Sequence, residues 1–456
     1  MSMRPTISWS ELRGRRVGVW GLGVEGRANV ARLAVLGVEP VLVDDRPGAD
    51  LGAGTSGSAT PPVLATAAGG LTALATCEVV VKAPGISRYR PEVADLRRRG
   101  VPVVGGLGLW MAEADRSRVL CVTGTKGKSS TTAIAAHLLR QWGYRCMAGG
   151  NIGAPPWDPE RAGADIDYWV IETSSYQATD LAYSPPVVAV TSLHPDHLDW
   201  HGDVETYYQD KLSACSQPGA GLTVANGDSE ELRARARLLG PRIEWVRAGD
   251  DPTADWMAAL HLPGVHNRRN ALIAQACLRA IGVGEAADTD ALAAAAAGFT
   301  PLPSRLTVVG EAAGVTFVDD SLSTNVLPTL AALEAFPDRR VALIAGGHDR
   351  GIDYAPLAAG LAARDTPTLV LAIPDSGPRI QAAIEAEQPG KTEVRACPDL
   401  DAAVAQGFRW AQPDGVVLLS PAAPSFGRFR DYRDRAEAFA AAVRACGAWL
   451  EPPPEP

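Results

Sequence analysis

The residues with the clearest chemical potential stand in the stretch VLCVTGTKGKSSTT, which runs from Val119 to Thr132. Its glycines allow backbone N–H groups to converge on a phosphate, Lys128 can reach β- and γ-phosphates, and the Ser129 hydroxyl can bind Mg²⁺. The usual phosphate-binding loop reads G-x-x-x-x-G-K-[ST], however, and Val122 occupies the place of its first glycine. Two interpretations follow: a nucleoside triphosphate site of a less common kind, or a glycine-rich connector with a surface lysine.

Glu172 and a histidine-containing segment supply candidate metal ligands. Glu172 ends an apolar strand predicted over Tyr168–Glu172, and HPDHLD (194–199) follows the next predicted strand, Val187–Thr191. Carboxylate oxygens are good ligands for Mg²⁺, and a histidine in the second segment would add another. Taken singly, each group would more often cap an element or satisfy a core hydrogen bond. Because the two strands are expected to be adjacent and to end beside the glycine loop, together they indicate a metal site.

Two asparagines stand at helical spacing in the segment GVHNRRN. Asn267 and Asn270 are three residues apart and therefore share one face of a helix. Their amide groups suit recognition of the polar edge of a nucleotide base.

A second glycine motif, G-x-G-x-x-G over Gly21–Gly26, follows a strand predicted over Arg16–Trp20 and opens a helix. With Asp44 and Asp45 about 20 residues later, it matches the fingerprint of a dinucleotide-binding fold and favours an NAD-dependent dehydrogenase. The alternative is a helix N-terminus that binds some other phosphate. Glu25 brings negative charge to the place where a pyrophosphate would lie, which counts against NAD.

These motifs must be positioned by alternating strands and helices. Short apolar, β-branched runs alternate with longer Ala-, Leu- and Arg-rich segments, which is typical of βαβ units and an α/β fold with parallel sheets. Three domains are expected, over residues 1–115, 116–300 and 301–456, and the prolines of Thr300–Pro303 mark the second junction. Further strands are predicted over Val41–Val43, Val79–Val81, Val119–Val122, Thr316–Val318, Val341–Ala345, Thr368–Ala372 and Val416–Ser420.

Length and composition exclude several classes. A chain of 456 residues is too long for one ordinary core. Its 43 basic and 52 acidic residues give a net charge of −9, which argues against nucleic acid or an anionic membrane as main partner. No apolar run approaches the roughly 18 residues of a membrane-spanning helix. The seven cysteines are scattered, without a C-x-x-C pair, which is typical of reduced thiols in a cytoplasmic protein.

Nine motifs in a fixed order make the chain resemble the Mur ligase superfamily, the ATP-dependent amide-forming enzymes of peptidoglycan synthesis. The resemblance covers nearly the whole chain and rests on TGTKGKSS (123–130), GGNIG (149–153), ETSSYQ (172–177), HPDHLDWHG (194–202) with Lys211, HNRRN (266–270), LPSR (302–305), DDSLSTN (319–325), GGHDRG (346–351) and LLSPAAPSF (418–426). The superfamily uses G-T-x-G-K-[ST] without the earlier glycine, which explains Val122. The resemblance implies a Rossmann-like UDP domain, a central P-loop ATPase domain with a mostly parallel sheet, and a C-terminal Rossmann-like domain.

Within the superfamily, the chain is most similar to the ligases that add glutamate to UDP-N-acetylmuramoyl-L-alanine. The resemblance implies that the first domain binds the UDP-substrate through Gly23, Val24, Asp45, Arg46, Pro84 and Gly85. It assigns ATP binding to Gly124, Thr125, Lys126, Gly127, Lys128, Ser129, Ser130, Asn267, Asn270, Arg305 and Asp320. Two Mg²⁺ ions are expected, with Ser129, Glu172, His197 and Lys211 as ligands; Lys128, His197, Asn151 and Lys211 are the implied catalytic residues. Lys211 matches a lysine that CO₂ carbamylates.

The glutamate-facing positions depart from the common D-glutamate pattern. That pattern has lysine where this chain has Leu322, and often lysine where it has Arg350, and arginine grips a carboxylate as a planar fork that lysine cannot reproduce. Lys126 also replaces the usual asparagine. These features resemble the branch that adds L-glutamate and relies on a separate epimerase, so L-glutamate is favoured over D-glutamate. The expected glutamate pocket consists of Thr324, Arg350, Ser425, Phe426 and Tyr432.

The resemblance further implies an acyl-phosphate intermediate, a monomer and a cytoplasmic location. Three alternatives stay open: a folylpolyglutamate synthetase, which shares the loop but lacks a UDP-type domain; the NAD-dependent dehydrogenase; and an inactive regulatory homologue. The last is disfavoured because Lys128, Glu172, His197 and Lys211 are all present.

Overall fold

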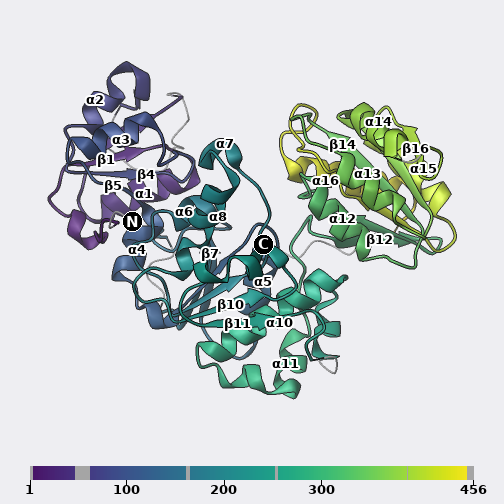
Figure 1. Ribbon diagram of the computed structural model, residues 1–456, viewed down its shortest axis with the longest axis horizontal. Coiled ribbons are helices and arrows are strands. Elements are labelled where there is room, and N and C mark those ends of the chain that lie inside the picture. The colour runs from purple at the N-terminus through teal and green to yellow at the C-terminus, as the bar shows by residue number, and fades with distance from the viewer. Residues whose placement is uncertain (1–3, 47–61, 161–164, 252–254, 388, 449–456) are drawn as a thin grey trace. The chain divides into compact units, whose positions relative to one another are not determined.

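The computed structural model describes residues 4–46, 62–160, 165–251, 255–387 and 389–448 (Figure 1). These residues form an α/β fold in two compact units. The first comprises Met1–Trp256 with Arg269–Ala296, and the second Met257–Arg268 with Ala297–Pro456. The first unit contains two sheets and the second contains one. No helix among the described residues has both the length and the apolar character that crossing a bilayer requires.

The first sheet is parallel and has the strand order β3-β2-β1-β4-β5. Its strands are β1 (Val17–Trp20), β2 (Val41–Asp44), β3 (Leu64–Ala65), β4 (Val79–Lys82) and β5 (Val103–Gly105). The α-helices between and after them are α1 (Val24–Val35), α2 (Leu71–Leu74), α3 (Pro91–Arg98) and α4 (Gly106–Glu113). β1 and β4 are buried at every position, as expected for central strands covered on both faces.

The second sheet is also parallel, in the order β11-β10-β9-β6-β8-β7. Its strands are β6 (Val119–Thr123), β7 (Cys146–Gly150), β8 (Tyr168–Glu172), β9 (Val187–Val190), β10 (Leu222–Asn226) and β11 (Ile243–Val246). Its helices are α5 (Lys128–Gln141), α6 (Ser175–Ala178), α7 (Leu198–His201), α8 (Val204–Leu212), α9 (Glu230–Ala234), α10 (Val265–Ala280) and α11 (Thr289–Ala296).

The sheet order corrects one sequence-based expectation. The strands that carry Glu172 and lead to the histidine segment, β8 and β9, are not neighbours, because β6 lies between them. Both still end beside the glycine loop, since β6 pairs in parallel with each of them. The crossover connections set this order, and hydrophobic patterning alone does not reveal it.

The third sheet has the order β12-β13-β17-β14-β15-β16, with β12 antiparallel to β13 and the remaining pairs parallel. Its strands are β12 (Thr307–Ala312), β13 (Val315–Asp319), β14 (Val341–Gly347), β15 (Thr368–Asp375), β16 (Glu393–Ala396) and β17 (Val416–Leu419). Its helices are α12 (Val326–Glu334), α13 (Ala355–Ala362), α14 (Gly377–Glu387), α15 (Leu400–Ala411) and α16 (Tyr432–Ala445). The two sides of this sheet carry separate hydrophobic clusters, as a three-layer arrangement requires.

All seven cysteines are free, five of them buried and two half-buried. Burial raises the pKa of every one of these thiols, to about 11 for Cys121 and about 12 for Cys146 and Cys215. The thiols are therefore protonated and inert near neutral pH.

Helix α6 begins with a reciprocal cap formed by Ser174 and Gln177. The Ser174 hydroxyl accepts from the Gln177 backbone N–H at 3.2 Å, and the Gln177 side chain accepts from the Ser174 N–H at 2.9 Å. We expect Ser174→Ala to lower the free energy of unfolding by about 1 kcal/mol, because it orphans an N-terminal N–H group. Ser174→Thr, which keeps the hydroxyl, is the matched control. Urea denaturation measures both, and equal stability of Ser174→Ala and wild type would contradict the cap's role.

Candidate functional site

The glycine loop between β6 and α5 takes a conformation that only glycine accepts easily. Gly124 and Gly127 have φ values of 138° and 87°. A Cβ atom on Gly127 would lie 2.7 Å from Oδ1 of Asn270, and one on Gly124 would collide with the Thr191 side chain. The loop therefore needs glycine at both positions for conformation and for space.

Side chains that follow β9 fix the rest of the loop. The Lys126 N–H donates to Ser192 Oγ at 2.8 Å, and the Thr191 hydroxyl donates to the Lys126 carbonyl at 2.6 Å. The Thr125 N–H donates to the Ser192 carbonyl at 2.9 Å. The roles of Thr191 and Ser192 were not predicted from the sequence, because a hydroxyl at the end of a strand does not indicate its hydrogen-bond partner.

Ser129, Glu172 and Asn151 meet directly. The Ser129 hydroxyl donates to one oxygen of Glu172 at 2.6 Å, and the Asn151 amide donates to the other at 2.8 Å. Glu172 and Ser129 are both buried. A carboxylate beside a hydroxyl is an oxygen donor set that suits Mg²⁺, which completes its octahedron with water and phosphate oxygens. Among the residues that the structure describes, no group of three or more His, Cys, Asp or Glu side chains is arranged to hold a metal ion.

Lys128 and Lys211 converge on one carbonyl. Their Nζ atoms donate to the Gly124 oxygen at 2.9 Å and 3.0 Å, and Lys128 also donates to the Thr125 oxygen at 3.1 Å. Lys211 is only 2% exposed, and its Nζ lies 5.0 Å from the centre of the Tyr207 ring. Burial lowers the pKa of Lys211 well below its usual range, and the nearby Lys128 charge lowers it further. The structure thus favours the neutral amine at Lys211.

His197 stands at the start of α7 in a left-handed conformation, with φ of 52° and ψ of 38°. Its Nε2 and the Lys126 Nζ each lie 3.8 Å from the same oxygen of Asp196. Partial burial lowers the pKa of His197, and the Asp196 charge opposes that shift. The imidazole, with 48% of its side chain exposed, is therefore neutral near pH 7 and competent to accept a metal.

The two candidate base-recognising asparagines are both buried on α10. Asn267 donates to the Pro263 carbonyl at 2.8 Å, and Asn270 faces Gly127 as described above. The structure thus brings Asn270 to the loop, within the first unit.

Arg305 and Asp320 belong to the second unit. Asp320 follows β13 and is buried, where it accepts from the Ser420 hydroxyl at 2.8 Å and also from the Ser323 hydroxyl. Burial raises the pKa of Asp320 to about 7. Arg305 is half-buried between two residues with positive φ, Ser304 and Leu306.

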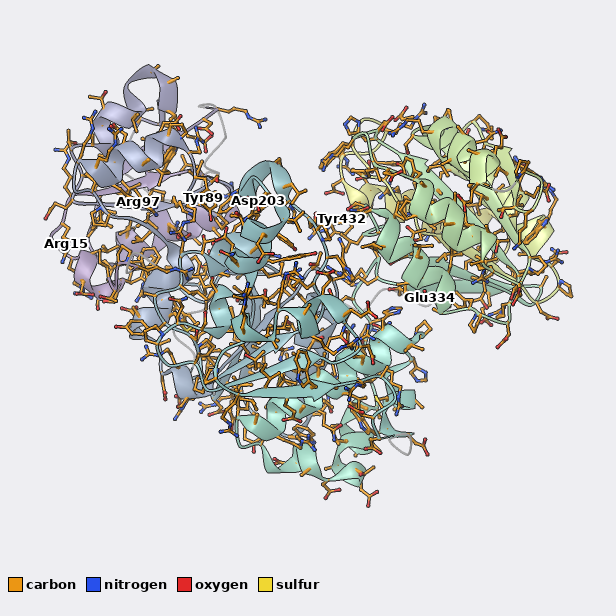
Figure 2. The ribbon with its side chains drawn as sticks, viewed as in Figure 1. Arg15, Tyr89, Arg97, Asp203, Glu334 and Tyr432 are labelled. Carbon is orange, nitrogen blue, oxygen red and sulfur yellow. The ribbon has the colours of Figure 1, made fainter. Side chains whose placement is uncertain are left out.

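The five predicted glutamate-pocket residues also lie in the second unit, in segments that follow β13, β14 and β17. Arg350 places its guanidinium 5.7 Å from the centre of the Phe426 ring, and both side chains are exposed. Ser425 is buried immediately before Phe426. Thr324 precedes α12, and Tyr432 is the first residue of α16 (Figure 2).

Arg435, which was not predicted from the sequence as a site residue, holds the segments near this proposed glutamate pocket. Arg435 on α16 is fully buried, and its guanidinium donates to the Ser321 carbonyl at 2.7 Å and the Ala423 carbonyl at 3.1 Å. It ties together the segments that follow β13 and β17. An arginine inside an amphipathic helix normally faces solvent, so the sequence pattern gave no reason to expect burial.

The predicted UDP-substrate residues surround the carboxyl ends of β1, β2 and β4. Asp44 accepts from the Leu22 N–H at 2.7 Å, and Asp45 pairs with Arg90 at 2.7 Å and accepts from Thr66 at 2.7 Å. Both carboxylates thus accept hydrogen bonds from other groups of the protein.

The turns at the same edge leave space above the backbone. Gly23, Val24 and Arg46 are exposed, and a Cβ atom on Gly23 or Gly85 would meet nothing within 4 Å. The Pro84 carbonyl accepts from Trp200 at 3.1 Å. These glycines therefore leave the backbone N–H groups approachable, as phosphate binding requires.

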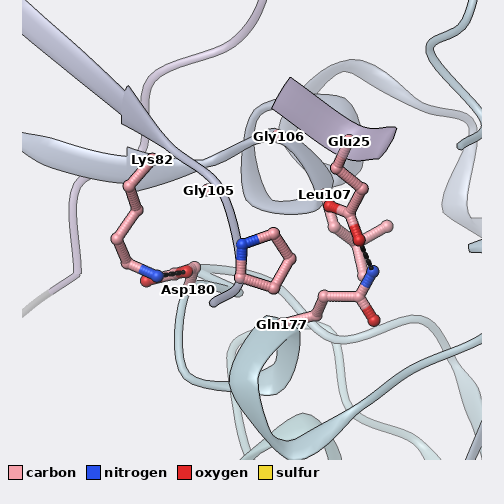
Figure 3. A pocket seen from close by; sticks show the side chains of 8 residues that line it. Glu25, Lys82, Gly105, Gly106, Leu107, Gln177 and Asp180 are labelled. Carbon is pink, nitrogen blue, oxygen red and sulfur yellow. Dashed lines mark hydrogen bonds and ion pairs between the residues drawn. The ribbon is translucent and has the colours of Figure 1, made fainter. Parts of the chain in front are cut away.

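A small pocket separates the first sheet from α6 in the first unit (Figure 3). It is lined by Glu25, Lys82, Pro84, Gly105, Gly106, Leu107, Gln177 and Asp180. Lys82 pairs with Asp180 at 2.6 Å, and Gln177 donates to Glu25 at 2.6 Å (Figure 3). Burial raises the pKa of Glu25 to about 7, although the Gln177 hydrogen bond acts in the other direction. Neither Lys82 nor Asp180 was predicted from the sequence as a site residue.

Two family models match the chain. The Mur ligase middle domain matches residues 122–259, and the model described as Mur ligase, glutamate ligase domain matches residues 304–423. A UDP-N-acetylmuramoyl-L-alanine--L-glutamate ligase of Micromonospora sp. is 44% identical, covering 95% of this chain and 98% of that protein. The enzyme of the same name from Xanthomonas euvesicatoria is 39% identical, covering 94% and 95%.

Solved structures give the same fold at low identity. A UDP-N-acetylmuramate-alanine ligase of Thermotoga maritima superposes with a TM-score of 0.56 at 18% identity, covering 95% of this chain and 100% of that one. The MurF ligase of Thermotoga maritima, in complex with ADP, gives 0.55 at 15% identity, covering 96% and 97%. The expected three-domain Mur ligase architecture is thereby confirmed. Since family models, full-length relatives and fold agree, the chain belongs to the Mur ligases and is an ATP-dependent ligase.

Proposed function

We propose that this ligase joins UDP-N-acetylmuramoyl-L-alanine to L-glutamate in the synthesis of peptidoglycan precursors. The observation that carries the proposal is the full-length similarity, up to 44% identity, to relatives named for that reaction. A folylpolyglutamate synthetase and a dehydrogenase are disfavoured, because Asp44 is held by the Leu22 backbone and the similarity includes the first domain. The domains proposed for UDP-substrate, ATP and glutamate are residues 1–115, 116–300 and 301–456.

In this proposal the glycine loop binds the triphosphate of ATP. Residues 124–130 supply N–H groups, and Lys128 supplies charge to the β- and γ-phosphates; Asn267, Asn270, Arg305 and Asp320 are the further proposed ATP contacts. Ser129, Glu172 and His197, with Lys211 as its carbamate, would hold two Mg²⁺ ions. When bound, the metal neutralises phosphate charge and polarises the phosphoryl group.

The geometry at Lys211 supports carbamylation. A lysine reacts with CO₂ only as the neutral amine, and burial beside Lys128 favours that form. The neutral amine nitrogen bonds to the carbon of CO₂ and loses one proton, so an uncharged amine becomes an anionic carbamate. The carbamate anion attracts the Lys128 ammonium group, and it supplies the oxygen ligands that Mg²⁺ prefers.

The proposed chemistry proceeds through an acyl phosphate. The substrate carboxylate attacks the γ-phosphorus of ATP and releases ADP, which converts a poor oxide leaving group into phosphate. The neutral amine of glutamate then attacks the acyl carbon, and the tetrahedral intermediate collapses to the amide with loss of phosphate and a proton. Lys128 offsets the repulsion between the substrate carboxylate and the γ-phosphate of ATP. Asn151 and His197 are proposed to lie beside the acyl phosphate.

Residues of the second unit favour L-glutamate. The guanidinium of Arg350 can bind a carboxylate through two parallel hydrogen bonds. Leu322 stands where the D-glutamate pattern has a lysine. Thr324, Ser425, Phe426 and Tyr432 are the proposed remaining contacts. A product containing L-glutamate would be passed to a separate epimerase, and the ligase would act as a monomer.

The decisive measurement is phosphate release from ATP with UDP-N-acetylmuramoyl-L-alanine and either glutamate enantiomer. We expect kcat/KM for L-glutamate to exceed that for D-glutamate by about 10²-fold or more, because an inverted centre breaks a bidentate contact worth roughly 3 kcal/mol. Release with D-glutamate alone would reverse the assignment of stereochemistry. Release with neither enantiomer would contradict the proposed function.

A further inference from the structure

Three buried side chains and one exposed side chain form a continuous hydrogen-bonded relay in the first unit. His201 has Nδ1 at 2.7 Å from Asp210 and Nε2 at 2.9 Å from the Ser175 hydroxyl. The Tyr89 hydroxyl donates to both oxygens of Asp210, at 3.0 Å and 2.8 Å. Because a carboxylate accepts only, Nδ1 carries the proton of the neutral ring and Nε2 accepts from Ser175.

Three of the four members of this relay lie within four residues of a proposed metal ligand in the sequence. Ser175 is three residues after Glu172, His201 is four residues after His197, and Asp210 directly precedes Lys211. The three pairs occupy three separate segments, at α6, α7 and α8. His201, on α7, thus bonds to a residue on each of the other two segments.

The His201 ring is also held in place by stacking. Its centroid lies 4.4 Å from that of Trp200, 5.2 Å from Tyr207 and 5.6 Å from Tyr176. The side chain is completely buried. A ring enclosed in this way transmits a displacement of one segment to the others, since it has no free volume to absorb it.

Tyr89, labelled in Figure 2, links the segment that follows β4 of the first sheet to Asp210 on α8. It lies between β4 and α3, four residues after the proposed UDP-substrate residue Gly85. The same segment is bonded to α7 twice, from Trp200 to the Pro84 carbonyl at 3.1 Å and from Ser87 to the Trp200 carbonyl at 3.0 Å. The turn proposed to bind the UDP-substrate is therefore connected to Asp210 through one phenol.

We propose that the relay Ser175–His201–Asp210–Tyr89 sets the positions of Glu172, His197 and Lys211 and couples them to occupancy of the UDP-substrate pocket. His201 and Asp210 are positioning residues, because they act through the proposed ligands and do not touch the reacting atoms. Substrate bound at Pro84–Gly85 restrains Tyr89, which restrains Asp210 and so the adjacent Lys211. The inference rests on the proposed function for the identity of the first ligand.

Tyr89→Phe tests the coupling without disturbing the core, since the Tyr89 side chain is 51% exposed. The measured quantity is the ratio of dissociation constants for Mg²⁺ with a non-hydrolysable ATP analogue, without and with saturating UDP-N-acetylmuramoyl-L-alanine. We expect Tyr89→Phe to reduce this ratio about fivefold, the lower range of typical couplings. Tyr144→Phe is the matched control, because it removes a phenol that donates to a carboxylate, Glu285, at 3.2 Å outside the relay.

His201→Phe tests positioning, since it keeps an aromatic ring and removes both hydrogen bonds. We expect kcat to fall about 10–100-fold and the Mg²⁺ concentration for half-maximal rate to rise similarly, with an unchanged KM for the UDP-substrate. Combined with Tyr89→Phe, the loss should be less than additive, because both changes act through Asp210. A purely structural role would change stability and leave the Mg²⁺ requirement as it is.

An unchanged coupling ratio in Tyr89→Phe, or a wild type with no coupling, would overturn the inference, and so would a Tyr144→Phe effect of equal size. Failure of the wild type to bind the UDP-substrate at all would instead contradict the proposed function. Because Tyr89→Phe does not rely on His201→Phe folding, the inference stays testable if the second variant is unstable.

Discussion

Turnover is expected to fall by about 10²–10³-fold when Lys211 is replaced by arginine, the range seen when one preorganised charged contact is removed. Arginine stays cationic at every relevant pH and cannot form the proposed carbamate. It would therefore leave two positive charges at the Gly124 carbonyl, where Lys128 already donates at 2.9 Å. Phosphate release under saturating substrates measures the effect.

Lys211→Met separates catalysis from stability. Methionine has a similar length and no polar group, so it avoids the free-energy cost of burying a polar amine in a residue that is only 2% exposed. We expect its free energy of unfolding to equal or exceed that of wild type while turnover falls as in Lys211→Arg. ¹³C-labelled bicarbonate should give a carbamate NMR signal in wild type and none in Lys211→Arg. Full activity of Lys211→Arg, or the absence of that signal in wild type, would refute the proposed role.

Lys82→Met is expected to lower the free energy of unfolding of the first unit by about 3–5 kcal/mol. Lys82 and Asp180 form an ion pair at 2.6 Å, with 0% and 5% of their side chains exposed, so the mutation leaves a buried carboxylate without its partner. The double variant Lys82→Met/Asp180→Leu should recover most of the loss, because a buried pair is often replaceable by apolar side chains. Urea denaturation followed by tryptophan fluorescence measures all three proteins.

Arg98→Met serves as the control for this prediction. Arg98 pairs with Asp95 at 3.0 Å, but its side chain is 75% exposed, and such surface pairs contribute about 1 kcal/mol at most. A loss in Lys82→Met no larger than in Arg98→Met would show that the buried pair has no special weight. An equally unstable double variant would show that packing around Lys82 decides the outcome.

Much of the site could be predicted because it depends on local order. The glycine loop lies where strand, turn and helix patterns place it, and Gly124 and Gly127 have the positive φ values that such a loop requires. Glu172 ends β8, as its apolar run indicated, and meets Ser129 at 2.6 Å. These features follow from hydrophobic periodicity and from the positions of glycines, both of which can be read from the sequence.

Other parts depend on pairings between distant segments. His201 and Asp210 face one another, yet neither residue type signals a partner nine residues away in sequence. Arg435 and Lys82 are charged residues in segments where charge normally indicates solvent, and both are buried. The position of β6 between β8 and β9 is likewise a property of the crossovers. Such features become visible only when the elements are placed together.

Because its native cysteines are buried or half-buried, the protein can be labelled selectively at a cysteine introduced into either unit. None of the seven native thiols is exposed, and burial keeps them protonated, so they react slowly with maleimides. A cysteine introduced at Val35, which is 60% exposed in the first unit, or at Leu327, 41% exposed in the second, would react first. A donor and an acceptor fluorophore at these positions would report the distance between the units through each catalytic cycle, with no need to remove a native residue.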